Sequence, residues 1–250
     1  EAAVLAKNEQ LRANLLRSIS HDLRTPLTSM IGASSSYLEN EAALPPKEKR
    51  ELVSEIYEDA NWLLHMVENL LSVTRITDGG ASVLKKTPEA AEEVLFDAVS
   101  TSRKRYPDLQ IKTVIPDEFV TAPMDPLLIK QVLLNLIENA YFHARSTKPL
   151  ECTLSSTEDA IKFCIRDYGT GIAPDRLSGI FDAVPSAPSS AASTVDTRKG
   201  MGIGLSICKA IVNAHNGEIT ARNLTEGAEF CFTIPKEEIH HETYDPNPRH

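Results

Sequence analysis

A histidine within a helical sequence pattern is the first candidate for chemistry. His21 has a carboxylic acid beside it at Asp22 and a hydroxyl group one helical turn further on at Thr25. A neutral imidazole is a competent nucleophile, and its ordinary pKa of about 6.5 leaves it mostly neutral at pH 7. Asp22 can hold the imidazole in the reactive tautomer and stabilise the charge that develops. Thr25 shares a helix face with His21, where its hydroxyl could orient a water molecule. This trio could support covalent catalysis at His21, although an isolated histidine on a helix is more often a surface or core residue.

Three later motifs could together bind a nucleoside triphosphate. In chain order they are NLIENA (135–140), DYGTG (167–171) and GMGIG (200–204). A neutral amide oxygen at Asn139 suits Mg²⁺, which keeps several waters and takes few protein ligands. The carboxylate of Asp167 follows a strand-like run and can accept a hydrogen bond from an exocyclic amine, which would select adenine over guanine. Glycines before a helix leave backbone N–H groups free to hold phosphates.

Each of these motifs alone is ordinary. Two asparagines one turn apart are usually a solvated helix face, and a lone GxGxG is usually a turn. Their shared order, an asparagine helix, then an aspartate after a strand, then glycines before a helix, favours a nucleotide site. We interpret the remaining candidate histidines as surface or core residues; these are His65, His215, His240 and His241.

The N-terminal part reads as two long amphipathic helices. Apolar residues recur every three or four positions from residue 1 to about 40, and again from Leu52 to Thr74. Leu44-Pro45-Pro46 interrupts the pattern. A hairpin of this kind has too little core of its own, and pairing two hairpins into a four-helix bundle buries both stripes. We therefore expect a symmetric homodimer.

After Asp78-Gly79-Gly80 the pattern changes to mixed α/β. We expect helices from Thr87-Pro88 to about 106, from Asp125-Pro126 onward, and over 203–215. Strands are expected at 82–86, 109–115, 118–122, 150–157, 160–168, 218–223 and 228–234. Residues 183–199 are rich in Ala, Ser and Pro and predict a mobile loop. The expected divisions are a helical dimerisation domain (1–77), a linker (78–80), an α/β domain (81–235) and a disordered tail (236–250).

Composition excludes several other classes of protein. The net charge of −9 argues against a nucleic-acid partner, since phosphate binding needs clustered Lys and Arg. No run approaches the roughly 18 apolar residues of a membrane span, and no signal peptide is visible. The cysteines lack a metal-binding spacing, so we expect reduced, packed thiols throughout; they are Cys152, Cys164, Cys208 and Cys231.

The sequence HDLRTPL, residues 21–27, resembles the H box of bacterial two-component sensor histidine kinases. With the three nucleotide motifs, the resemblance extends from about residue 11 to 235. The later part is similar to the ATPase domain that histidine kinases share with type II topoisomerases, HSP90 and MutL (the GHKL or Bergerat fold, an α/β sandwich). The runs ISHDLRTPLTSMIG and ICKAIVNAHNG most resemble the KdpD-type sensor kinases of potassium homeostasis.

This resemblance implies a specific activity. His21 would be phosphorylated from Mg·ATP and would pass the phosphoryl group to an aspartate of a response regulator, and Asp22 and Thr25 would support phosphatase action. It implies that residues 1–77 are the histidine phosphotransfer domain and residues 81–235 the catalytic ATP-binding domain. It also implies that residues 172–199 form an ATP lid and that Asn139 binds Mg²⁺. The ATP-binding residues would be Asn135, Asn139, His143, Asp167, Gly169, Gly171, Gly200, Gly202 and Gly204. We expect the chain to be the soluble cytoplasmic region of a longer, membrane-anchored bacterial sensor.

Two departures from the family pattern leave alternatives open. Phe142 stands where these kinases often carry Lys or Arg, and the lid keeps Ile180-Phe181 but lacks the usual second aromatic residue. One alternative is therefore a kinase-impaired sensor that acts mainly as a response-regulator phosphatase. Another is an ATP-hydrolysing clamp, since Glu138 directly precedes Asn139 and a glutamate there could activate water. A third is a dimeric scaffold that binds no nucleotide.

Overall fold

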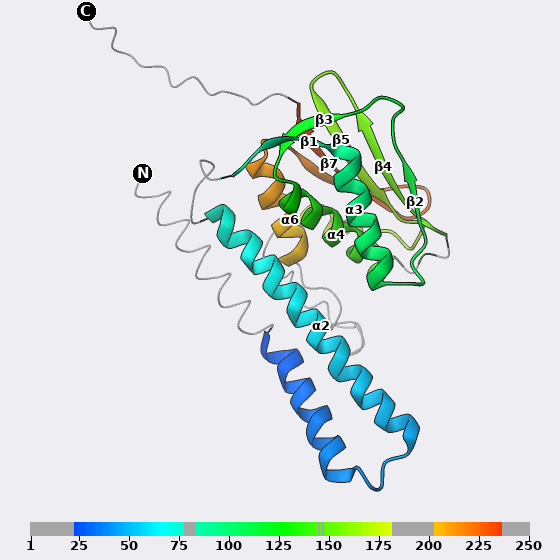
Figure 1. Ribbon diagram of the computed structural model, residues 1–250. Helices are drawn as coiled ribbons and strands as arrows, with labels where there is room; N and C mark the ends of the chain where they lie inside the picture. Colours follow the sequence, from blue (N-terminus) through cyan, green and yellow to red (C-terminus); the bar gives the residue numbers. More distant parts are fainter. Residues whose placement is uncertain (1–22, 78–83, 145, 147, 182–202, 237–250) are drawn as a thin grey trace, which may run out of the picture. The chain divides into compact units, whose positions relative to one another are not determined.

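A computed structural model of the chain describes residues 23–77, 84–144, 146, 148–181 and 203–236 (Figure 1). It divides into two compact units, Glu1–Leu71 and Ser72–His250. Several residues singled out in the sequence lie outside the described residues, namely His21, Asp22, Gly200 and Gly202. The expected linker, the loop at 183–199 and nearly all of the expected tail also lie outside them. No helix in the described part of the chain is both long and apolar enough to cross a bilayer.

The first unit contains the predicted helical hairpin. Its first helix covers residues 23–40, and after a short turn α2 runs over Pro46–Thr77. The turn begins where Asn40 accepts backbone hydrogen bonds from Ala43 and Leu44. The two helices are joined by a hydrogen bond of 3.1 Å from Ser29 Oγ to Glu55 Oε1. This prediction of a helical hairpin is confirmed.

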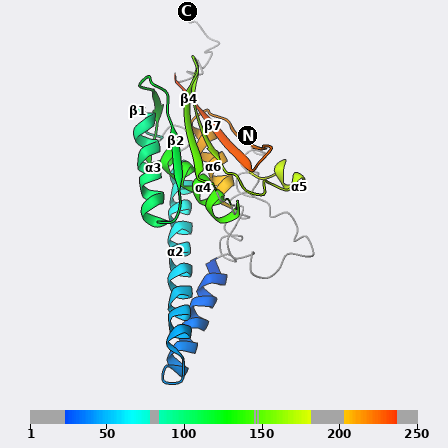
Figure 2. The ribbon, with the colours of Figure 1, turned by 90° about the vertical axis from the view of Figure 1, so that its right-hand side faces the viewer.

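The second unit is a five-stranded sheet covered on one face by helices (Figure 2). The strand order is β2-β4-β5-β7-β6, and only the β2–β4 pair is parallel. The strands are β2 (Ile111–Val114), β4 (Leu150–Ser156), β5 (Ala160–Arg166), β6 (Ile219–Asn223) and β7 (Ala228–Pro235). The helices are α3 (Ala91–Arg105), α4 (Pro126–His143), α6 (Ile203–Ala214) and the one-turn α5 (Pro174–Leu177). The predicted α/β sandwich is confirmed.

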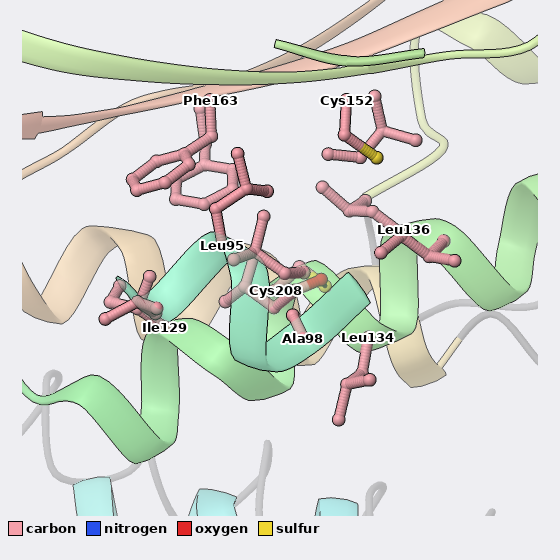
Figure 3. Packing of buried hydrophobic residues seen from close by; sticks show 14 of the residues in the cluster. Leu95, Ala98, Ile129, Leu134, Leu136, Cys152, Phe163 and Cys208 are labelled. Atoms are coloured by element: carbon pink, nitrogen blue, oxygen red, sulfur yellow. Dashed lines mark hydrogen bonds between the residues drawn. The ribbon is translucent and has the colours of Figure 1, made fainter. Parts of the chain in front are cut away.

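The core lies between the sheet and the helices, as Figure 3 shows for Phe163 and Cys152 above α3 and α4. Alternation along β5 turns Ile161, Phe163 and Ile165 inward, and Phe163 stacks on Phe232 of β7 with ring centroids 4.9 Å apart. Helix α4 is buried on most of its circumference because α3 and α6 pack on either side of it. Its position is therefore set by the core rather than by solvent-exposed contacts.

The start of α4 is fixed by two side chains. Asp125 is the N-cap, and its Oδ1 accepts hydrogen bonds from the backbone N–H groups of Leu127 and Leu128, as its position before Pro126 predicted. His215 directly follows α6 and is 2% exposed. Its Nε2 accepts a hydrogen bond of 3.0 Å from the backbone N–H of Asp125. Its Nδ1 lies 2.8 Å from the Ile211 carbonyl oxygen, which it can reach only as a donor. His215 is thus a neutral core histidine, as interpreted from the sequence.

The secondary structure of residues 84–91, where the described part of the second unit begins, differs from the prediction. Residues 84–86, the described part of the strand expected at 82–86, are not in a strand. Thr87-Pro88 does not cap a helix; it lies in β1 (Thr87–Ala90), which pairs antiparallel with β3 (Thr121–Met124), and α3 begins at Ala91. The pairing with β3 supplies backbone hydrogen bonds from a distant segment, and these override the local capping preference of Thr-Pro.

The expectation of four reduced cysteines is wrong for two of them. Cys164 and Cys231 form a disulfide, whereas Cys152 and Cys208 are free and buried. The register of β5 against β7 places Cys164 directly opposite Cys231. These residues are 67 positions apart in sequence, so their spacing carried no sign of the bond. Burial raises the pKa of both remaining thiols to about 12, which keeps them protonated and unreactive.

The neutral state of His215 predicts a pH-dependent stability. Burial lowers the pKa of its imidazole, so below the ordinary value of 6.5 the unfolded chain binds a proton that the folded chain does not. Stability should therefore fall as the pH drops below 6.5, until the folded-state pKa is passed. Urea unfolding followed by circular dichroism between pH 5.5 and 7.5 measures this.

The substitution His215→Gln should cost about 1–3 kcal/mol at pH 7.5, because it leaves a buried hydrogen-bonding group without its partner. It should also flatten the pH dependence in this window. An unchanged slope in the variant would assign the pH dependence to other groups.

Candidate functional site

Asp167 lies at the point where β5 meets β7. It follows Arg166, the last residue of β5, and is 5% exposed. Its Oδ1 accepts hydrogen bonds from the backbone N–H of Gly169 at 2.9 Å and of Ala228 at 3.2 Å. Its Oδ2 accepts no hydrogen bond from the described residues. A carboxylate held by one oxygen, with the other still able to accept, suits recognition of an exocyclic amine.

Gly169 brings the Asp167 loop against the end of α4. A β-carbon built at Gly169 would lie 1.8 Å from the carbonyl oxygen of Ala144, the C-cap of α4. The Thr170 N–H donates to the same oxygen at 3.3 Å. Only glycine permits this approach, so DYGTG is fixed relative to the helix that carries the two asparagines.

Asn135 of α4 lies against the beginning of α6. Asn135 is 8% exposed, and its Nδ2 lies 3.4 Å from the carbonyl oxygen of Gly204, to which it donates. Asn139, one turn further along, is half-buried and its side chain makes no hydrogen bond to the described residues. Its amide is therefore available to a ligand. His143, another turn on, is exposed.

Gly204 has open space around it, since a β-carbon there would meet no atom of the described residues within 4 Å. It is the second residue of α6, whose first N–H groups have no partner within the helix. Such groups favour an anion, and phosphate is the anion expected here. The structure thus places Asp167 and Gly169 against the end of α4, and Gly204 against Asn135 in the middle of the same helix.

The residues that raised alternatives have clear positions. Phe142 lies in an aromatic group at the end of α4, edge-on to Tyr106 and Tyr141 at centroid distances of 5.5 and 5.1 Å. Glu138 faces α3, where its Oε1 accepts hydrogen bonds from Arg105 at 2.6 Å and Tyr106 at 3.3 Å. Burial and this carboxylate raise the pKa of Tyr106. An ion-paired glutamate is poorly suited to activate water.

Gly227 contributes to the site although no motif pointed to it. Its φ is +78°, and a β-carbon there would lie 2.1 Å from the Asp167 carbonyl oxygen. It is 60 residues from Asp167 in sequence, so only the pairing of β5 with β7 brings the two together. A glycine in a β-turn is the sole local signal, and it says nothing about the partner.

In the first unit, the described part of the predicted phosphoacceptor motif begins after Asp22. Thr25 is exposed on the first helix, and Pro26 beside it is buried. The structure therefore leaves the Thr25 hydroxyl accessible.

Comparison with known proteins agrees with this geometry. A family model described as histidine kinase-, DNA gyrase B-, and HSP90-like ATPase matches residues 124–238, and the His Kinase A (phospho-acceptor) domain matches residues 11–79. Sensor protein KdpD of Clostridium acetobutylicum is 42% identical over 238 residues, covering 95% of this chain and 26% of that protein. Sensor protein KdpD of Escherichia coli K12 is 34% identical over 240 residues, with the same two coverages.

Among solved structures, histidine kinase ThkA in complex with response regulator protein TrrA superposes with a TM-score of 0.70. It is 20% identical and covers 93% of this chain and 64% of that one, so it supports the fold. With both domain matches and an α/β ATPase fold after a helical hairpin, the chain belongs to the histidine kinases. Within that family it is similar to the KdpD sensor proteins, and it spans about 26% of their length.

The geometry of Asp167 predicts how a single substitution changes base selection. In Asp167→Asn, Oδ1 can still accept from Gly169 and Ala228, but the second oxygen becomes an NH₂ donor that faces the donor amine of adenine. The affinity for ATP should fall roughly 10- to 100-fold, as expected for a lost charge-assisted hydrogen bond. Preference for ATP over GTP should shrink, because guanine offers an acceptor at that position.

Isothermal titration calorimetry with ATP and GTP measures both effects. Asp117→Asn, the same change on an exposed turn of this domain, is the matched control. Equal ATP affinity for Asp167→Asn and the control would mean that Asp167 does not contact the base.

Proposed function

We propose that this chain is an autophosphorylating histidine kinase that uses Mg·ATP to phosphorylate His21 and then transfers the phosphoryl group to an aspartate of a response regulator. The observation that carries this proposal is that α4 contacts both the Asp167 loop, through Gly169 at its end, and the beginning of α6, through Asn135 and Gly204, in a domain of the ATPase family. The phosphoacceptor domain match over residues 11–79 contains His21.

Each proposed site residue has a distinct role. Asp167 would accept a hydrogen bond from the exocyclic amine of adenine, while Gly169 and Gly171 would let the backbone approach the base. Gly200, Gly202 and Gly204 would present N–H groups to the phosphates, with Asn135 and His143 beside them. Asn139 would bind Mg²⁺, whose charge offsets that of the phosphates. The free amide of Asn139 and the open space at Gly204 fit these assignments.

In the transfer step, a bond forms between an imidazole nitrogen of His21 and the γ-phosphorus while the bond from that phosphorus to the leaving oxygen of ADP breaks. Asp22 would orient the imidazole through its other nitrogen and stabilise the positive charge until the ring proton is lost. A response-regulator carboxylate would next take the phosphoryl group from His21. In the phosphatase activity, Asp22 and the exposed Thr25 would orient a water molecule to hydrolyse the acyl phosphate of the response regulator.

The hairpin surface supports a homodimer. Large apolar side chains remain exposed along one face of each helix; they are Leu27, Ile31 and Leu38 on the first helix and Val53, Tyr57, Leu64 and Val67 on α2. Their spacing of three, four or seven residues keeps them on one side. A second hairpin would cover this face and complete a four-helix bundle. Because the chain spans 26% of its KdpD relatives, we also propose that it is the cytoplasmic part of a longer membrane-anchored sensor.

A second candidate function keeps the fold but shifts the balance of activities. Phe142, packed against Tyr106 and Tyr141, supplies no positive charge where a basic residue is frequent in the family. A sensor with weakened nucleotide binding would act mainly as a response-regulator phosphatase. The clamp alternative is less well supported, because the carboxylate of Glu138 is engaged by Arg105.

Substitution of the phosphoacceptor tests the proposal directly. Incubation of the wild-type chain with Mg·[γ-³²P]ATP should give label that is stable to alkali and lost in acid, as expected of a phosphoramidate. His21→Gln should reduce the label by more than about 100-fold, since an amide cannot act as the nucleophile. Nucleotide affinity should be unchanged in this variant.

Absence of label on the wild type, with ATP still bound, would contradict the kinase proposal. Dephosphorylation of a phosphorylated response regulator under the same conditions would then favour the phosphatase. Phosphate release with multiple turnovers that is insensitive to His21→Gln would instead favour an ATPase clamp.

The dimer predicts that charge on the apolar face separates the subunits. The proposed dimer would bury Ile31, which contributes about 1.5–3 kcal/mol to the free energy of association, and Ile31→Glu removes that contribution. A two-fold interface contains the position twice. The dissociation constant should therefore rise at least about 100-fold. Sedimentation equilibrium measures it, with Ala42→Glu in the exposed turn between the two helices as a control that makes the same charge change of −1. A monomeric wild type at micromolar concentration would contradict the dimer.

A further inference from the structure

The turn between β6 and β7, with the flanking residue Asn223, holds the Asp167 loop at three places, one of them through Lys148, and none of these residues belongs to a motif of the nucleotide site. The turn covers residues 224–227 and is closed by a hydrogen bond of 3.0 Å from Leu224 N to the Gly227 carbonyl oxygen. Its two flanking residues, Asn223 and Ala228, are paired in register. The turn is therefore a defined structure rather than a loose connection.

The first contact is made by the side chain of Asn223, the last residue of β6. Its Oδ1 accepts a hydrogen bond from the Ile172 N–H, and its Nδ2 donates to the Ile172 carbonyl oxygen, both at 2.7 Å. One amide thus satisfies both backbone groups of a residue 51 positions away. This two-point attachment fixes the backbone of Ile172 as a neighbouring strand would.

Ile172 occupies a critical position in the chain. It directly follows Gly171, the last residue of DYGTG, and lies two residues before Pro174 at the start of α5. Gly171 has a φ of +74°, and a β-carbon there would lie 2.9 Å from Asn223 Oδ1. Asn223 therefore fits against the loop only because residue 171 is a glycine in this left-handed conformation.

The second and third contacts reinforce the first. Gly227 lies against the backbone and carboxylate of Asp167, since its β-carbon would fall 2.7 Å from Oδ1. Glu226 pairs with Lys148, whose Nζ lies 2.7 Å from Oε1 and 5.2 Å from the ring centroid of Tyr168. This salt bridge is exposed and contributes little by itself. Together the three contacts hold residues 167, 168 and 172 from one side.

We propose that Asn223 is a positioning residue of the nucleotide site, which holds the chain leaving the adenine loop in its binding conformation and thereby sets the affinity for ATP. This rests on the proposed function of Asp167 and the DYGTG loop in binding ATP. Asn223 bonds to the backbone of Ile172, so it would act on ATP binding by keeping the loop ordered.

The physical basis is preorganisation. Without Asn223, the N–H and C=O of Ile172 would bond to water, and the exposed loop would gain alternative conformations. The nucleotide would then have to order the loop on binding, and that cost reduces its affinity. Once ATP is bound the loop is ordered in either case, so the rate of phosphoryl transfer at saturating ATP should not change.

The test compares Asn223→Asp and Asn223→Ala with Asn213→Asp, the same substitution on an exposed position of α6. In Asn223→Asp the Nδ2 donor becomes an oxygen that faces the Ile172 carbonyl, while Oδ1 can still accept. For both Asn223 variants the KM for ATP in autophosphorylation, and the dissociation constant from calorimetry, should rise about tenfold. The kcat should stay within about twofold of the wild type.

Thermal unfolding of the three variants separates a positioning role from a merely structural one. A lower melting temperature with an unchanged dissociation constant for ATP, measured well below that temperature, would overturn the proposal. So would equal KM values for Asn223→Asp and Asn213→Asp. Gly227→Ala, which damages the same turn from its other side, should also raise the dissociation constant.

Failure of the underlying function has a different signature. If the wild type binds no ATP, the proposed nucleotide site is wrong, and the role of Asn223 falls with it. If the wild type binds ATP and the Asn223 variants bind it equally well, only the inference about Asn223 is wrong.

Discussion

The close approach of Gly169 to the carbonyl of Ala144 is the contact on which the rest of the nucleotide site depends. It fixes the distance between a loop that follows β5 and the end of a helix that is buried on most sides. Other parts of this unit are placed relative to α4: Asn135 lies against α6, the first turn of α4 is capped by Asp125, and His215 fixes that cap. A side chain at residue 169 would force the loop and the helix apart and separate the proposed adenine contact from the proposed phosphate contacts.

Features with local causes were predictable from the sequence. Asp125 before Pro126 gave the start of α4 because capping depends on neighbouring residues only. Asn216-Gly217 likewise ended α6, where Asn216 adopts a φ of 58° and the Gly217 N–H donates to Val212. The order of the three nucleotide motifs indicated one site, although it could not show that Ala144 is the surface on which Gly169 rests.

Features that depend on pairing between distant segments were not predictable. Thr87-Pro88 has the composition of a helix start, but β3 recruits it into a strand. Nothing in the sequence near Cys164 indicates that Cys231 lies opposite it, because the register of β5 with β7 is fixed by the core residues between them. The same limit applies to Asn223 and Ile172. A single sequence shows which residues can bond but not which segments the sheet places side by side.

The two units use their apolar residues in opposite ways. In the α/β unit the large apolar side chains of α4 and the sheet are mostly buried within one chain. In the hairpin, a continuous set of them faces outward on both helices. A helix pair with one face uncovered gains stability when another surface covers it. In the proposed homodimer, the concentration of the protein would therefore enter its folding equilibrium.

The disulfide between Cys164 and Cys231 has a topological consequence. It joins residues 67 apart, and the stretch between them contains Asp167, both glycine-rich motifs and α6. The proposed adenine contact and the proposed glycine phosphate contacts therefore lie within one covalent macrocycle, whereas Asn135, Asn139 and His143 of α4 lie outside it. Closing a ring of this size lowers the entropy of the unfolded chain by the equivalent of about 4 kcal/mol in the chain-entropy view. A single peptide-bond cleavage within the ring would linearise the macrocycle without releasing a fragment, so the nucleotide-binding half could be nicked and still remain one molecule.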